Sequence, residues 1–175
     1  MQPQARHRPE RTYKTGAVTR MLRWFSLAVA LTASALLLVG YPQMPNEVPI
    51  HFDAAGQPDA YGDKMVVLGV ACGIILVQLA MYWASKKPQI MDYPARVTDE
   101  NAQRLYREGE RFFVYLGLSI STMTAGVGEL YSTDGSTVGS YLVRISPAAM
   151  AVIAITGVVR MRHASKPESE SGFHG

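Results

Sequence analysis

The sequence predicts an all-α integral membrane protein with four transmembrane helices and an ordered extracytoplasmic loop between helices 1 and 2. Three observations lead to this prediction. Apolar residues gather in long uncharged runs, lysine and arginine collect on one side of these runs, and a polar stretch from Tyr41 to Lys64 is rich in proline, glycine and aspartate. We expect a membrane domain at 24–161, a cytoplasmic basic tail at 1–23 and a disordered cytoplasmic tail at 162–175.

The first three predicted spans lie at about 24–41, 65–85 and 112–131. The first two contain no charged residue, and each is close to the ~20 residues that cross ~30 Å of hydrocarbon. The third is interrupted by hydroxyl side chains, which can bond back to their own helix. A cleaved signal peptide would also place an apolar run after basic residues, but further apolar residues follow Ala33 and Ala35 where a mature start would lie.

The fourth span is shorter. Ile145 to Val159 alone would be roughly 22 Å long at ~1.5 Å per residue, so we extend the span to 141–161. The extension includes Arg144, whose charge is tolerated near a helix end because the side chain can reach the headgroups. Pro147 then falls in the first helical turn, where a missing backbone N–H costs little.

The orientation follows from the positive charges. Of the 17 lysines and arginines, 15 lie in or directly beside the two tails and the middle loop, and only Lys64 and Arg144 lie on the other side of the spans. Cytoplasmic loops retain positive charge, so both termini should be cytoplasmic and the Tyr41 to Lys64 loop should lie outside. The basic residues lack an aromatic stacking motif, which favours the lipid bilayer as their partner over nucleic acid.

The outer loop has local order. Val48, Ile50 and Phe52 alternate with other residues around Pro49, which predicts a short extended segment. Turn chemistry follows at 53–56 and again at 57–60. Asp63 is placed to cap the second span, where its carboxylate meets the positive end of the helix dipole.

The loop also carries a family pattern. Its elements are Pro45, Pro49-x-His51-Phe52, Gly56-x-Pro58-Asp59 and Gly62-x-Lys64, directly after a first span. This pattern resembles the bacterial membrane family called domain of unknown function 1648, which also forms the N-terminal part of SdpI-type immunity and signalling proteins. Tyr93-Pro94 and Thr98-x-Glu100-Asn101 resemble a second patterned stretch of that family. The resemblance covers about 24–131 and implies a module of the bacterial plasma membrane whose biochemical role is not established.

Five polar residues and one aromatic residue on the outer side are the candidate ligand-binding or partner-binding residues: His51, Phe52, Asp53, Asp59, Lys64 and Glu129. Structural roles are expected for Pro45, Pro49, Gly56, Pro58, Gly62 and Asp63. Imidazole and carboxylate can ligate zinc, and His51 could sense protons. No spacing matches a known metal motif, so we favour hydrogen-bonding roles and expect no metal or other cofactor.

The spans contain two further features of interest. Gly69 and Gly73 form a small-x-x-x-small pair, which predicts close helix packing within the chain or, as an alternative, a homodimer seam. Glu129 lies near an outer span end, where Arg144 or Lys64 could pair with it. The span interiors carry no further ionisable groups, which argues against a transporter.

The middle loop predicts a helix that starts at Thr98, which is a good N-cap. Its charged residues favour a solvated helical stalk, with a docking face for a cytoplasmic protein as the alternative. Taken together, the sequence favours a non-enzymatic module that binds, senses or recruits a partner, as in immunity or signalling. An accessory subunit of a larger membrane complex is the alternative. A metal-dependent enzyme is least favoured, because no activated nucleophile or phosphate-binding loop is present.

Overall fold

The computed structural model describes residues 8–53, 57–132 and 137–167. Its helices are α1 (Ala17–Gly40), α2 (Met65–Lys86), α3 (Ala102–Ser132) and α4 (Thr137–Ala164), with short 3-10 helices η1 (Tyr41–Gln43) and η2 (Pro88–Ile90). Strands β1 (Glu47–Phe52) and β2 (Pro58–Asp63) form an antiparallel hairpin. Four helices in these ranges are long and apolar enough to cross a membrane. The fold is therefore helical as predicted, although the outer loop adds a two-stranded sheet.

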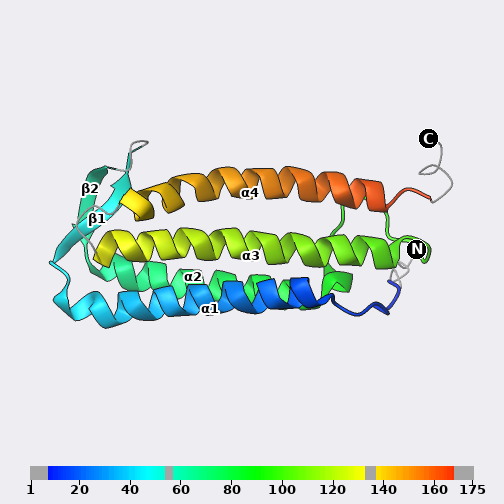
Figure 1. Ribbon diagram of the computed structural model, residues 1–175, viewed down its shortest axis with the longest axis horizontal. Coiled ribbons are helices and arrows are strands. Elements are labelled where there is room, and N and C mark those ends of the chain that lie inside the picture. Colours follow the sequence, from blue (N-terminus) through cyan, green and yellow to red (C-terminus); the bar gives the residue numbers. More distant parts are fainter. Residues whose placement is uncertain (1–7, 54–56, 133–136, 168–175) are drawn as a thin grey trace, which may run out of the picture.

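The long helices run side by side along one axis (Figure 1). α1, α2 and α3 pack against one another, whereas α4 packs on α3 at the far side from α1 and α2. α3 is therefore the central helix. The hairpin lies at one end of the molecule, here called the outer end, and the start of α1 and the 87–101 connection lie at the opposite, inner end.

Three helices start earlier than the predicted spans. α1 begins at Ala17 and so includes Arg20 and Arg23. α3 has 31 residues and is roughly 46 Å long at ~1.5 Å per residue, which exceeds ~30 Å of hydrocarbon. α4 begins at Thr137, so Pro147 lies inside the helix rather than in its first turn. The earlier start fits the packing of Gly139, in the first turns of α4, directly on α3.

The second predicted turn, at 57–60, is wrong. Residues 58–60 belong to β2, where Pro58 pairs with Phe52 and Ala60 with His51. The chain instead reverses between Asp53 and Gln57, whose backbones are joined by an N–H to O bond of 2.9 Å. Asp53 Oδ1 also accepts a hydrogen bond from the Gln57 N–H at 2.8 Å. Both the backbone and the side chain of Asp53 therefore bond to Gln57.

The helix-packing glycines also differ from the prediction. A Cβ added at Gly69 or Gly73 would meet nothing within 4 Å, so neither residue marks a close helix contact within the chain. The tight crossing is that of α3 and α4, where a Cβ at Gly126 would lie 2.8 Å from Leu142 Cβ and one at Gly139 would lie 2.8 Å from the Gly126 carbonyl. Only glycine allows these backbones to approach so closely.

Candidate functional site

The base of the hairpin is fixed to the outer ends of the helices. Val48 is buried in a cluster with Leu37 of α1 and Val67 of α2. The Tyr131 hydroxyl on α3 donates to the Pro49 carbonyl at 2.6 Å. Three helices thus hold β1 by apolar contacts and a hydrogen bond, which makes the hairpin a supported element and not a free loop.

Four described residues of the hairpin, Ile50, His51, Asp59 and Tyr61, are exposed, and we call them the hairpin tip. His51 Nδ1 lies 2.5 Å from Asp59 Oδ1, and the two side chains are 69% and 46% exposed. Ile50 and Tyr61 are also exposed, at 46% and 60%. Ile50 covers Gly62, where an added Cβ would come within 3.0 Å of its Cδ1. The exposed tip therefore combines a histidine–aspartate pair with apolar surface.

The structure places the predicted outer residues in several separate contacts. No three histidine, cysteine, aspartate or glutamate side chains come together within 8–53, 57–132 and 137–167. His51 and Asp59 are brought together across the strands, whereas Asp53 closes the turn. Gly56 lies outside the described residues. Pro45 is exposed ahead of β1.

Lys64 and Asp63 hold the junction between the hairpin and α2. Lys64 Nζ donates to the Met44 carbonyl at 3.3 Å and lies 5.1 Å from the centre of the Tyr41 ring. Asp63 Oδ1 accepts a hydrogen bond from the Met65 N–H at 2.7 Å. This contact supplies the acceptor that a helix N-terminus needs. Both side chains therefore have structural contacts at this junction.

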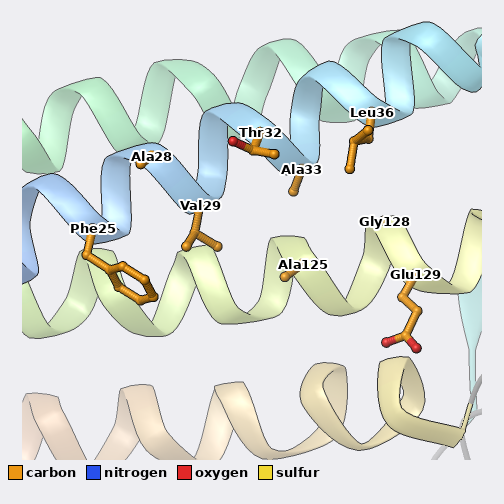
Figure 2. Close-up of a pocket in the computed structure, with 9 residues that line it drawn as sticks. All are labelled: Phe25, Ala28, Val29, Thr32, Ala33, Leu36, Ala125, Gly128 and Glu129. Atoms are coloured by element: carbon orange, nitrogen blue, oxygen red, sulfur yellow. The ribbon is translucent and has the colours of Figure 1, made fainter.

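Glu129 lines an apolar groove of about 520 Å³ between α1 and α3. Figure 2 shows Phe25, Val29 and Leu36 along the α1 side, with Ala125 and Gly128 on α3. The Glu129 side chain extends toward α4 at the outer end of the groove. It supplies the one carboxylate among the lining residues.

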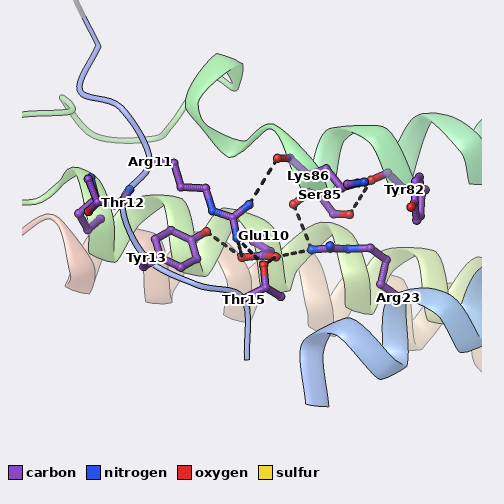
Figure 3. A network of polar contacts seen from close by, with 10 residues as sticks. Arg11, Thr12, Tyr13, Thr15, Arg23, Tyr82, Ser85, Lys86 and Glu110 are labelled. Carbon is purple, nitrogen blue, oxygen red and sulfur yellow. Dashed lines mark hydrogen bonds and ion pairs between the residues drawn. The ribbon is translucent and has the colours of Figure 1, made fainter. Parts of the chain in front are cut away.

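A polar site that the sequence did not predict lies at the inner end, around Glu110 of α3 (Figure 3). This carboxylate accepts hydrogen bonds from the hydroxyls of Tyr13 at 2.8 Å and Thr15 at 2.6 Å. It also forms ion pairs with Arg11, at 3.3 Å, and with Arg23. Arg23 Nη2 reaches the Ser85 carbonyl of α2 at 3.3 Å as well. We call Arg11, Tyr13, Thr15, Arg23 and Glu110 the Glu110 cluster.

Because the Glu110 cluster is buried, its ion pairs matter for the free energy of unfolding. The side chains of Glu110 and Arg23 are 2% and 8% exposed. An unpaired charge in such a place is costly, so removing one partner from a buried pair destabilises by about 3–5 kcal/mol. Burial, followed by the hydrogen bond to Glu110, raises the pKa of Tyr13. Tyr13 therefore stays protonated and remains a donor to the carboxylate.

The cluster fastens residues 8–16, which we call the strap, across the inner end. The strap is also held by Arg8, which donates to the carbonyls of Gln89 and Met91. The Tyr106 hydroxyl donates to the Pro9 carbonyl at 3.0 Å. Gln103 of α3 accepts from the Thr12 N–H at 2.9 Å and donates to the Glu10 carbonyl at 2.7 Å. These contacts order part of the predicted basic tail.

The prediction that the middle loop forms a solvated helical stalk is wrong. The start of α3 buries Ala102, Leu105 and Tyr106 completely. The physical reason is that the strap and the 87–101 connection cover this face. Asn101, in the patterned stretch, accepts from the Thr98 N–H at 2.9 Å and donates to the Arg96 carbonyl at 3.0 Å. The helix therefore begins at Ala102, after a turn closed by Asn101.

The sequence held one signal for the Glu110 cluster. Glu110 immediately precedes Arg111 and the apolar run from Phe112, so a carboxylate stands close to a membrane boundary on a helix that continues into the span. At such a place an ionised group needs a partner. Its partners come from a segment about 90 residues earlier in the chain, a pairing that no local pattern specifies.

Comparison with known proteins supports the predicted family. Residues 28–76 match the family model "Domain of unknown function (DUF1648)". The match runs from α1 through the hairpin into α2, so the recognition of this family in the outer loop is confirmed. The resemblance to SdpI-type proteins rests on the sequence pattern alone.

A protein of Archaeoglobus fulgidus described as "Uncharacterized protein" is 36% identical over 81 residues. The alignment covers 39% of this chain and 44% of that protein. The chain therefore spans less than half the length of this relative. No solved structure matches.

We predict that Glu110→Gln lowers the free energy of unfolding by about 3 kcal/mol, because Arg23 then stays buried without a counterion. The measurement is denaturant unfolding of the purified protein in mild detergent. The same variant should speed tryptic cleavage within the strap, at Arg11 and Lys14.

The matched control is Glu108→Gln, two residues away. Glu108 pairs with Arg111, whose side chain is 40% exposed, so its loss should cost about 1 kcal/mol or less and leave strap cleavage unchanged. Equal effects of the two variants would contradict the role given to Glu110.

Proposed function

We propose that this protein is a non-enzymatic, four-span membrane protein that binds or recruits a partner through its hairpin. The observation that carries the proposal is the contrast between the two parts of the hairpin. Its base is buried at Val48, whereas His51, Asp59 and Tyr61 at its tip are exposed. A rigid support with an exposed polar and aromatic tip suits recognition, because little conformational entropy is lost on binding.

The membrane orientation belongs to the same proposal. The inner end carries most of the arginines and lysines, and the hairpin carries Lys64, so the positive-inside rule places the hairpin outside and both termini in the cytoplasm. The host membrane is the plasma membrane of the cell. Participation in immunity or signalling is supported by the resemblance of the hairpin pattern to SdpI-type proteins.

An accessory subunit of a larger membrane complex is the second candidate. It is favoured by α4, which packs mainly on α3 and exposes apolar residues along its length, including Val152 and Ile155 at 59% and 66%. A partner helix could cover this face. The two candidates place the partner on different surfaces, the first on the polar hairpin and the second on the apolar face of α4.

The topology is tested with single cysteines in a Cys72→Ser background. Gln57 on the hairpin and Glu100 near the start of α3 are both exposed, so either position can be replaced with little disturbance. A membrane-impermeant maleimide should label Gln57→Cys in intact cells and Glu100→Cys only after permeabilisation. Labelling of both from outside would contradict the orientation.

Partner binding is tested by photo-crosslinking in intact cells of the native host. A benzophenone amino acid at Tyr61, which is 60% exposed, should give a discrete adduct that Asp59→Asn reduces, since this change disrupts the His51–Asp59 pair. The same probe at Ile155 serves as the comparison. An adduct at Ile155 alone would favour the accessory subunit, and the absence of adducts at both positions would contradict both candidates.

A further inference from the structure

A polar cleft lies at the inner end, between the start of α3 and the end of α4. It has a volume of about 610 Å³. Four cationic side chains, one histidine and one carboxylate line it: Arg104, Arg111, Arg160, Lys166, His163 and Glu108. We call it the basic cleft. It is separate from the Glu110 cluster, whose partners come from the strap, α1 and α2.

Arg104 forms part of the wall of the basic cleft. Its Nε donates to the Ala164 carbonyl at 3.2 Å and its Nη2 to the Lys166 carbonyl at 2.9 Å. The Ala164 carbonyl belongs to the C-terminal end of α4, which carries partial negative charge, and Lys166 follows two residues later. By satisfying both carbonyls, Arg104 fixes α4 to α3 and reduces the repulsion that an anion would meet there.

The remaining charges leave the basic cleft strongly positive. Glu108 is compensated by Arg111, whose Nη1 lies 2.6 Å from Glu108 Oε1. Arg160 and Lys166 form no ion pair with any residue of the described ranges. Two long cationic side chains thus border the cleft without a carboxylate partner among residues 8–53, 57–132 and 137–167, so an anion entering it would meet donors that these residues do not neutralise.

We propose that the basic cleft binds the phosphate of an anionic phospholipid headgroup, with Arg160 and Lys166 as its main ligands. A guanidinium presents paired N–H donors that match two phosphate oxygens, and an ammonium adds a compact positive charge. Basic pockets between the cytoplasmic ends of membrane helices suit such headgroups. The His163 imidazole offers one further N–H donor.

The surroundings of the cleft favour a lipid over a soluble phosphate. α4 leads directly from Arg160 to exposed apolar residues, with Val159 at 47% and Val158 at 38% exposure. An acyl chain could lie on this surface while its headgroup occupies the cleft. This choice of source rests on the proposed membrane location, whereas phosphate recognition by the cleft does not.

The test uses the purified full-length protein in a neutral detergent and isothermal titration calorimetry. The probes are dioctanoyl phosphatidic acid, dioctanoyl phosphatidylcholine and glycerol 3-phosphate. Phosphatidic acid should bind with saturation, and the other two should bind at least about tenfold more weakly. Because detergent removes any orientation, failure here is distinguishable from failure of the topology experiment.

The variants locate the site. Arg160→Gln and Lys166→Gln should each weaken phosphatidic acid binding about tenfold, as expected for loss of a charge-assisted hydrogen bond. Glu108→Gln should strengthen it, because a repulsive charge is removed. Arg20→Gln is the matched control, since it removes one exposed charge from α1, away from the cleft, and should leave binding unchanged.

Three outcomes would overturn the proposal. Equal binding of phosphatidylcholine, whose headgroup has no net charge, would show that the net negative charge of the lipid is not recognised. Equal binding of glycerol 3-phosphate would assign the cleft to a soluble phosphate compound instead of a lipid. An equal loss in Arg20→Gln and Arg160→Gln would mean that overall positive charge, and not the cleft, attracts the lipid.

Discussion

The buried carboxylate of Glu110 is the constraint on which the inner end depends. The Glu110 side chain is 2% exposed and must be paired, because an isolated charge in such surroundings is costly. Its donors come from the strap and from α1, and Arg23 continues the contact to the Ser85 carbonyl of α2. One side chain of the central helix thus joins four parts of the chain.

The outer end is held by a different kind of interaction. There Val48 packs with Leu37 and Val67, and Tyr131 bonds the backbone of β1. Between the two ends, Gln78 of α2 donates to Ser26 of α1 at 3.1 Å. The molecule is therefore held by charge pairing at one end and by apolar packing at the other.

The sequence predicts what is encoded in local runs and local chemistry. Uncharged runs locate the four helices, and the Asp63 carboxylate accepts the Met65 N–H at the start of α2, although Lys64 and not Asp63 is the N-cap residue. Small-residue spacing identified Gly69 and Gly73 but could not say which helix face is packed, and Gly126 and Gly139 make the close crossing. The strap was not predicted because Glu110 draws its partners from the distant N-terminal segment. The second predicted turn, at 57–60, is replaced by β2 because residues 58–60 pair with β1.

The most direct test of the role of Glu110 is a double-mutant cycle with Arg23→Gln and Glu110→Gln, scored by the free energy of unfolding in detergent. Because the two side chains form a buried ion pair, we predict that the double variant is more stable than the sum of the single losses implies, by about 2 kcal/mol or more. Losses that add to within about 0.5 kcal/mol would contradict the account.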